Sequence, residues 1–138
     1  MSYNYLPYVG INDISFGNSL EQVHSKLGEP VDEFYRGWLK HVLTDMYQDF
    51  MVYYSDKKVV EAIEFYGNID VKTGDMVIGD KTFDIILQDF LKRDNKLIID
   101  GDGFTSIKYG LGVYCPSWKD SEDLLIESVI VFRKGYYD

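Results

Sequence analysis

The sequence predicts an α+β fold made of two tandem modules, each a short helix followed by an antiparallel meander of strands. Two observations support this prediction. A capped, amphipathic helix pattern occurs twice, with an offset of 63 residues between the copies. Each copy is followed, in the same order, by segments rich in β-branched and aromatic residues, which are typical of strands. A chain of 138 residues is also the size of one domain with one core.

The first helix is predicted in "SLEQVHSKLGEP", residues 19–30. Ser19 can cap the helix, and Gln22, three positions later, can complete a capping box. Gly28 ends the helix. The apolar side chains that recur at helical spacing are Leu20, Val23 and Leu27.

The second helix is predicted in "IGDKTFDIILQDFL", residues 78–91, with Thr82 as its cap. Its apolar positions match those of the first helix: Phe83, Ile86 and Phe90. This correspondence predicts that the helix is part of a repeated unit and not an isolated element.

The segments that follow each helix predict about three antiparallel strands per half. In the first half these are 33–38, 50–54 and 60–66, and in the second half 96–100, 111–115 and 126–132. The loop "PSWKDSED", residues 116–123, reads as a hairpin connection. We therefore predict a single domain over 1–138, with pseudo-repeats at about 11–67 and 76–135 joined by 68–75, and with both helices on one face of the sheet.

The charge balance limits the class of partner. Fourteen Lys and Arg residues against 23 Asp and Glu residues give a net charge of −9, which repels phosphate backbones and favours a basic protein partner over direct nucleic-acid binding. The single Cys115 excludes an internal disulfide and fits a reducing compartment. The sequence contains neither a signal-like start nor an apolar run long enough to span a membrane, so we expect a cytoplasmic protein without membrane contact.

The sequence predicts no catalytic, metal-binding or cofactor-binding residues, and hence no enzyme. His24 and His41 have no His or Cys at metal-ligand spacing, so both are interpreted as structural or surface residues. Cys115 reads as a small hydrophobic residue at the end of a strand. "DGDGF", residues 100–104, fails the EF-hand pattern at later positions and is interpreted as a hairpin turn.

The predicted strands carry apolar side chains on both faces, whereas helices can cover only one. The second face is then available to a partner, unless loops or a second copy of the chain cover it. An aromatic surface rimmed with carboxylates suits a basic protein. The candidate partner-binding residues are Tyr47, Tyr53, Tyr109, Tyr114 and Trp118, with Asp45, Asp49, Asp120, Glu122 and Asp123 as charge partners.

The segment "FGNSLEQVHSKLGEP", residues 16–30, followed by meandering strands, resembles the modules of the β-lactamase inhibitor protein and of BamE-type lipoproteins. This resemblance implies helices on one face of an antiparallel sheet and protein binding by the other. Those families are exported, and the tandem inhibitor carries disulfides that one cysteine cannot form. The small, acidic and aromatic-rich chain is also similar to bacterial immunity proteins, which neutralise a toxin domain.

The leading hypothesis is therefore a cytoplasmic bacterial immunity protein, a toxin inhibitor that occludes a basic toxin domain, with a nuclease among the candidates. One alternative is a small enzyme or ligand-binding module with a pocket between the two halves. Another is a homo-oligomeric structural protein. Whether the chain is a monomer or a homodimer stays open at this point.

Overall fold

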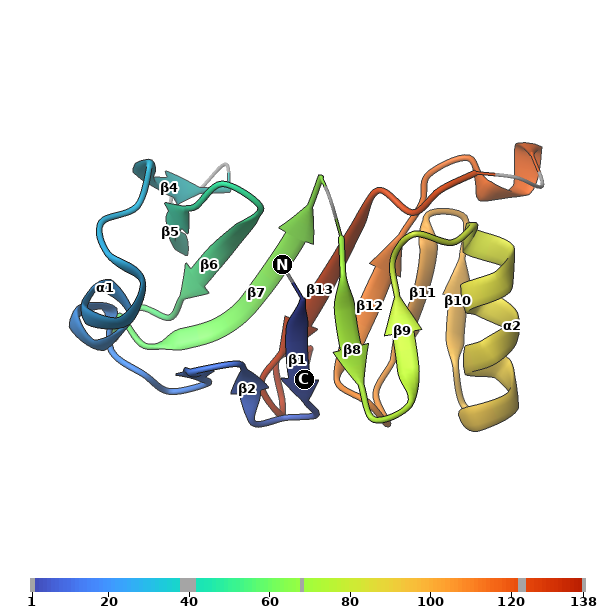
Figure 1. Cartoon of the computed structure of the whole chain (residues 1–138), viewed down its shortest axis with the longest axis horizontal. Coiled ribbons are helices and arrows are strands. Elements are labelled where there is room, and N and C mark those ends of the chain that lie inside the picture. The colour runs from blue at the N-terminus through green and yellow to red at the C-terminus, as the bar shows by residue number, and fades with distance from the viewer. Residues whose placement is uncertain (1, 38–41, 68, 122–123, 138) are drawn as a thin grey trace.

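The computed structural model of the protein describes residues 2–37, 42–67, 69–121 and 124–137. These residues form an α+β structure that is mostly strand, with two α-helices and two sheets (Figure 1). The helices are α1 (Leu20–Leu27) and α2 (Phe83–Arg93), and a short 3-10 helix, η1, covers Trp118–Asp120. Neither α-helix of the described chain has the length and hydrophobicity that crossing a membrane requires.

The larger sheet is antiparallel and continuous across both halves of the chain. Its eight strands follow the order β10–β11–β12–β13–β7–β6–β5–β4. The strands of the first half are β4 (Asp32–Arg36), β5 (Val42–Met46), β6 (Phe50–Tyr54) and β7 (Val60–Tyr66). Those of the second half are β10 (Ile98–Asp100), β11 (Gly103–Ser106), β12 (Leu111–Tyr114) and β13 (Ser128–Phe132).

The smaller sheet has five strands in the order β3–β2–β1–β8–β9. They are β1 (Tyr3–Leu6), β2 (Gly10–Ile11), β3 (Ile14–Ser15), β8 (Val71–Thr73) and β9 (Met76–Ile78). The N-terminal strand β1 pairs in parallel with β8, within the segment that the sequence predicted to be a connection. Strands of two to four residues are too short to show an alternating pattern, which is why the sequence did not predict this sheet.

The two halves meet at the pairing of β7 with β13. Ile63 lies opposite Val131 and Phe65 lies opposite Val129, so the register is symmetric about the central pair of Glu64 and Ile130. This pairing joins two four-stranded meanders into one sheet.

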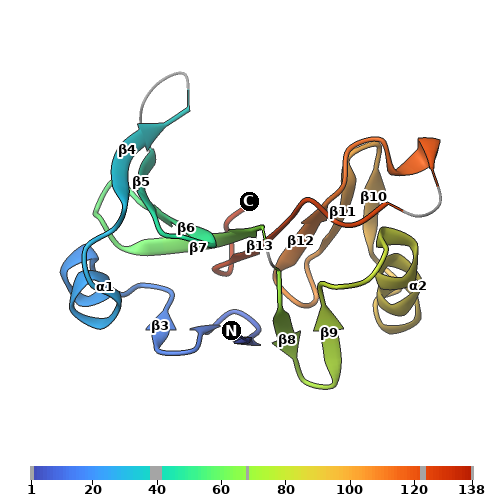
Figure 2. The same ribbon diagram turned by 45° about the horizontal axis from the view of Figure 1, so that its top comes forward.

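Both helices lie on the same side of the large sheet, together with the small sheet (Figure 2). Val23 of α1 and Phe83 and Phe90 of α2 are buried in one core. The rings of Phe90 and Phe104 on β11 are 5.0 Å apart between centroids. Each large apolar side chain buried here contributes about 1.5–3 kcal/mol relative to exposure, so this interface holds the helices on the sheet.

Both helices begin in equivalent ways. Ser19 and Gln22 form the predicted capping box. Thr82 occupies the cap position of α2, but its side chain makes no capping hydrogen bond. Instead, the backbone N–H of Phe83 donates to Leu124 O, just as the N–H of Leu20 donates to Lys58 O. Each helix start is therefore tied to the chain that leads into the last strand of its own half.

Each half contains four strands, not the three that the sequence predicted. The additional strands are β5 and β11, next to the first strand of each meander. Asp45 lies in β5 and Gly103 begins β11, and both residue types are depleted in strands. The turn predicted at "DGDGF" is present between β10 and β11.

Gly103 gives a sharp test of this packing. Its φ is +147°, and a Cβ added there would lie 1.9 Å from the carbonyl oxygen of Val113 on β12. Because both backbone strain and a steric clash result, we expect Gly103→Ala to lower the free energy of unfolding by at least about 2 kcal/mol. Gly101→Ala, in the same hairpin, is the control because nothing lies within 4 Å of its added Cβ. Urea unfolding compares the two variants, and equal midpoints would contradict this account.

Candidate protein-binding surface

The large sheet is concave on the side away from the helices. Its two ends rise on either side of the C-terminal segment, which lies over the middle of the sheet (Figure 2). A row of directly opposed residues runs across this concave face: Met51, Glu64, Ile130, Gly112 and Thr105. Gly112 contributes no side chain to the row, so the floor of the face is hollowed there.

A groove of about 330 Å³ lies on this concave face. It crosses the junction between β7 and β13, so both halves contribute to its lining. The side chains that define its character are Arg36, Glu64, Asp100, Asp102, Tyr114, Ser128, Ile130, Tyr136 and Tyr137. Among the described residues that line it there is no histidine or cysteine. The groove is thus an aromatic and acidic surface, with Arg36 as its cation.

Glu64 is the polar centre of the groove. Its Oε1 accepts a hydrogen bond of 2.5 Å from the Tyr53 hydroxyl, and its Oε2 accepts one of 2.7 Å from the Ser128 hydroxyl. Nη1 of Arg36 lies 3.7 Å from Oε1. Burial, and then the hydrogen bond to Glu64, raise the pKa of Tyr53 above its usual value. Glu64 is therefore held in place by donors from three different strands.

The C-terminal segment covers part of the concave face. Tyr136 stacks on Phe132 with ring centroids 5.7 Å apart, and Tyr137 meets the same ring edge-on at 4.9 Å. Arg133 makes an ion pair of 3.0 Å with Glu61. This cover buries Phe132 and Tyr53, so the aromatic surface that remains open is smaller than the sequence predicted.

The ten predicted partner-binding residues do not form one surface. Tyr114 is 40% exposed and lines the groove. Asp120 is exposed on η1, and Asp49 is half-buried. Glu122 and Asp123 lie outside the described residues. The remaining five are turned to internal contacts: Tyr47, Tyr53, Tyr109, Trp118 and Asp45.

Those five side chains have visible structural roles. The Tyr47 hydroxyl donates to Gly28 O, and the indole N–H of Trp118 donates to Asp100 O. Tyr109 meets Phe90 edge-on. Tyr47, Tyr53 and Asp45 are buried, which removes them from direct contact with a partner. Of these five residues only Tyr53 lies in a predicted strand, and alternation along that strand could not show which face the rest of the protein covers.

The structure brings Asp45 together with two residues that the sequence did not connect to it. His24 Nε2 lies 2.7 Å from Oδ2 of Asp45 and 3.8 Å from Oε2 of Glu33. Tyr54 also donates a hydrogen bond of 2.7 Å to the same Oδ2. His24, Glu33 and Asp45 lie within 21 positions of one another in the sequence, but they belong to α1, β4 and β5. Their proximity therefore becomes visible only once the helix is packed and the strands are paired.

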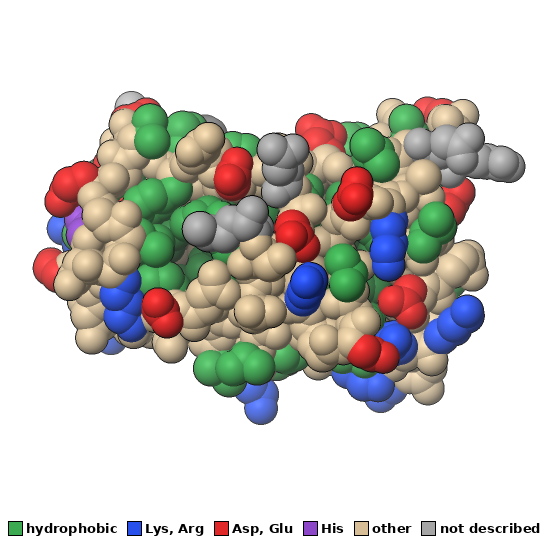
Figure 3. All heavy atoms as spheres, in the orientation of Figure 1, with side chains coloured by type: hydrophobic (Ala, Val, Ile, Leu, Met, Phe, Trp, Pro, Cys, Tyr) green, Lys and Arg blue, Asp and Glu red, His purple; other side chains and the backbone are tan. Residues whose placement is uncertain are grey.

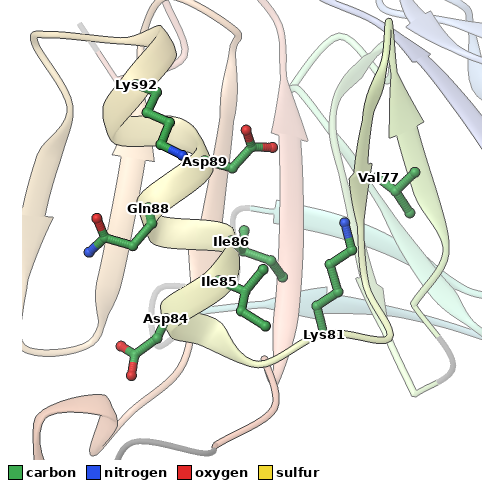
Figure 4. Close-up of a pocket in the computed structure, with 8 residues that line it drawn as sticks. All are labelled: Val77, Lys81, Asp84, Ile85, Ile86, Gln88, Asp89 and Lys92. Atoms are coloured by element: carbon green, nitrogen blue, oxygen red, sulfur yellow. The ribbon is translucent and has the colours of Figure 1, made fainter.

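A hollow of about 490 Å³ lies beside α2. Figure 4 shows Ile85, Ile86 and Lys81 on the side of the helix that faces Val77, whereas Asp84 and Gln88 point away. The Asp89 carboxylate also lies on the side that faces Val77 (Figure 4). On the molecular face that carries the small sheet, acidic and basic side chains are interspersed and hydrophobic side chains gather between α1 and β7 (Figure 3).

No family model, curated protein or solved structure matches the chain.

Tyr53 predicts a measurable dependence of stability on pH. Because its pKa is raised in the folded state, the stability it contributes is fully present below the unfolded value of about 10 and is lost as the pH rises above it. Between about pH 8 and about pH 11, the free energy of unfolding should fall by roughly 1 kcal/mol less in Tyr53→Phe than in the wild type. Chemical unfolding at both pH values measures this difference. The exposed Tyr35→Phe is the matched control and should follow the wild type.

Proposed function

We propose that the protein is a protein-binding inhibitor of the immunity type, which neutralises a basic toxin domain by occluding it with the concave face of its large sheet. The observation that carries this proposal is the groove across the β7–β13 junction, where aromatic side chains lie beside carboxylates. Its chemistry is that of an interface core with a charged rim.

The open aromatic groups give the proposal its anchors. Tyr114 is 40% exposed and Tyr137 is 57% exposed, and they come from β12 and from the C-terminal segment. Tyrosine is enriched among the residues that dominate binding energy, because it combines a large apolar ring with a hydroxyl. Two such rings over a hollowed floor suit a protruding element of a partner.

The charge of the groove and of the whole chain favours a basic partner. Glu64, Asp100 and Asp102 line the groove, and the chain carries a net charge of −9. An acidic surface attracts a basic domain over a distance limited by salt, which speeds association. Occlusion then follows from the fit, and no chemical step by the inhibitor is required.

The fold supports the proposal through two tandem modules. The repeated helix start, the four-stranded meander and the symmetric β7–β13 register are consistent with duplication of one helix-plus-meander unit. Joining the units edge to edge makes a sheet wide enough to hold a concave face, while both helices stay on the other side (Figure 2).

A second candidate function is a ligand-binding module, because the groove lies between the two halves, where such modules place their sites. The two proposals differ in what the groove holds. A small ligand would bind to the isolated protein with a salt dependence set by its own charge, whereas a basic protein domain gives an on-rate that falls with added salt.

Tyr114→Ala tests the proposed surface. Pull-down from an extract of the native cell identifies the partner, and binding of that purified partner to each variant is then measured by surface plasmon resonance. We expect Tyr114→Ala to weaken binding at least about tenfold, because an anchoring aromatic side chain contributes about 2 kcal/mol. Tyr35→Ala is the control, since Tyr35 is also exposed, at 55%, but lies on β4 opposite Leu43, a residue of the helix-side core.

The carboxylates are tested by Asp100→Asn combined with Asp102→Asn. We expect this double variant to slow association and to flatten its dependence on salt, with a smaller effect on dissociation. Inhibition of the partner's toxicity is measured alongside binding. An interaction that depends on Tyr35 and not on Tyr114, or an on-rate that salt does not change, contradicts the proposal.

A further inference from the structure

The cluster of His24, Glu33 and Asp45 lies on the helix side of the large sheet, away from the proposed binding surface. One ligand atom from each residue lies within 4.8 Å of the other two. Glu33 on β4 and Asp45 on β5 are directly opposite each other in the strand register. His24 reaches them from α1, with Nε2 2.7 Å from Asp45 Oδ2.

The cluster leaves one buried oxygen without a partner. The side chain of Asp45 is 0% exposed, and Oδ2 accepts hydrogen bonds from Tyr54 and lies against His24. Within the described part of the chain, Oδ1 of the same carboxylate has no hydrogen-bond partner. A buried acceptor without a donor is unfavourable, so the folded protein gains stability if a cation occupies this position.

The opposed carboxylates add to this cost. Like charges directly across two strands destabilise the pair. A cation bound between the Glu33 and Asp45 carboxylates neutralises this repulsion.

The second half of the chain shows that the fold does not require these polar groups. Asp45 pairs with Val52 in the first half, and Phe104 pairs with Val113 at the same place in the second. Across from Phe104 lies Ile99, which corresponds to Glu33.

The helices extend this correspondence. Leu20 and Phe83 make equivalent hydrogen bonds at the starts of α1 and α2. His24, four residues after Leu20, therefore corresponds to Leu87, four residues after Phe83. In the strands, Tyr54 lies two residues after Val52 and Cys115 lies two residues after Val113, so Tyr54 corresponds to Cys115. One half thus has four polar groups where the other has leucine, isoleucine, phenylalanine and cysteine.

We propose that His24, Glu33 and Asp45 form a binding site for a divalent transition-metal ion of the zinc type. The same backbone packs well with apolar side chains, so a His–carboxylate cluster around the buried Asp45 in only one half points to a ligand and not to a structural need. The site would join α1 to β4 and β5 at the outer end of the first half.

The donor set selects the class of metal. Magnesium and calcium favour oxygen ligands alone, whereas an imidazole nitrogen with carboxylate oxygens suits zinc. Bond lengths of about 2.1 Å in a tetrahedron place ligand atoms about 3.4 Å apart. The separation of 3.8 Å between His24 Nε2 and Glu33 Oε2 is close to this value, whereas the 2.7 Å contact of Nε2 with Asp45 Oδ2 is a hydrogen bond that a metal ion would replace.

Neighbouring groups orient the ligands. The Tyr54 hydroxyl fixes the Asp45 carboxylate through Oδ2. Nδ1 of His24, the nitrogen that faces away from the cluster, lies 3.9 Å from Oε2 of Glu29. If the 86% exposed Glu29 side chain closes this distance to a hydrogen bond, the tautomer whose Nε2 is free to bind metal is favoured. Glu33 is 42% exposed, which gives the ion a path from solvent.

Zinc binding by the whole chain tests the proposal. The chelator-treated protein is titrated with zinc chloride by calorimetry, and with cobalt(II) for the visible absorption that a tetrahedral site produces. We expect one equivalent to bind, and the melting temperature to rise with the free metal concentration. His24→Gln and Glu33→Gln should each weaken binding at least about tenfold, since removal of even an orienting neighbour costs about 10–100-fold.

His41→Gln is the matched control, because it removes the other histidine and leaves the cluster intact. It should bind zinc as the wild type does. Circular dichroism confirms that each variant is folded, and Glu33→Gln changes a side chain at the surface, so loss of binding there is separable from misfolding. The proposal is overturned if the folded wild type binds neither metal, which leaves only an ion pair between His24 and Asp45. Retention of binding by both His24→Gln and Glu33→Gln also overturns it.

Discussion

The pairing of β7 with β13 is the constraint on which the rest of the structure depends. Each half alone would be a four-stranded meander with one helix, and its last strand would expose an unpaired edge. Pairing those two edges removes both at once and buries Val129 and Val131 against Ile63 and Phe65. The symmetric register also keeps both helices on one side, so a single core forms beneath the sheet and the opposite face is left concave.

Much of this arrangement could be predicted from the sequence, because it depends on local signals. The capping box at Ser19 and Gln22 and the helical spacing of apolar residues are readable without coordinates. The small sheet was not predictable, since β1 and β8 are short and distant in the sequence. The membership of the candidate surface could not be predicted: Tyr53 is of a residue type common at interfaces, yet Phe132 and the C-terminal segment bury it.

The C-terminal segment explains why the concave face is only partly open. An eight-stranded sheet with a helix layer on one side leaves apolar side chains on the other, and water contact with all of them would be unfavourable. Tyr136 and Tyr137 pack on Phe132 and cover the first-half side of the junction. What stays exposed is the hollow over Gly112, beside Tyr114. The part of the concave face that the C-terminal segment covers, which stabilises the fold, thus lies next to the part proposed to bind a partner.

The two halves share a backbone but differ in what they place inside it. At equivalent positions the second half has Phe104 and Leu87, which stabilise the core by burial, whereas the first half has Asp45 and His24. Replacing apolar groups by a buried carboxylate and an imidazole lowers stability unless each polar atom finds a partner. The helix-plus-meander backbone thus accommodates either set of side chains, and Oδ1 of Asp45 is the buried side-chain oxygen that stays without a hydrogen-bond partner in the described part of the chain.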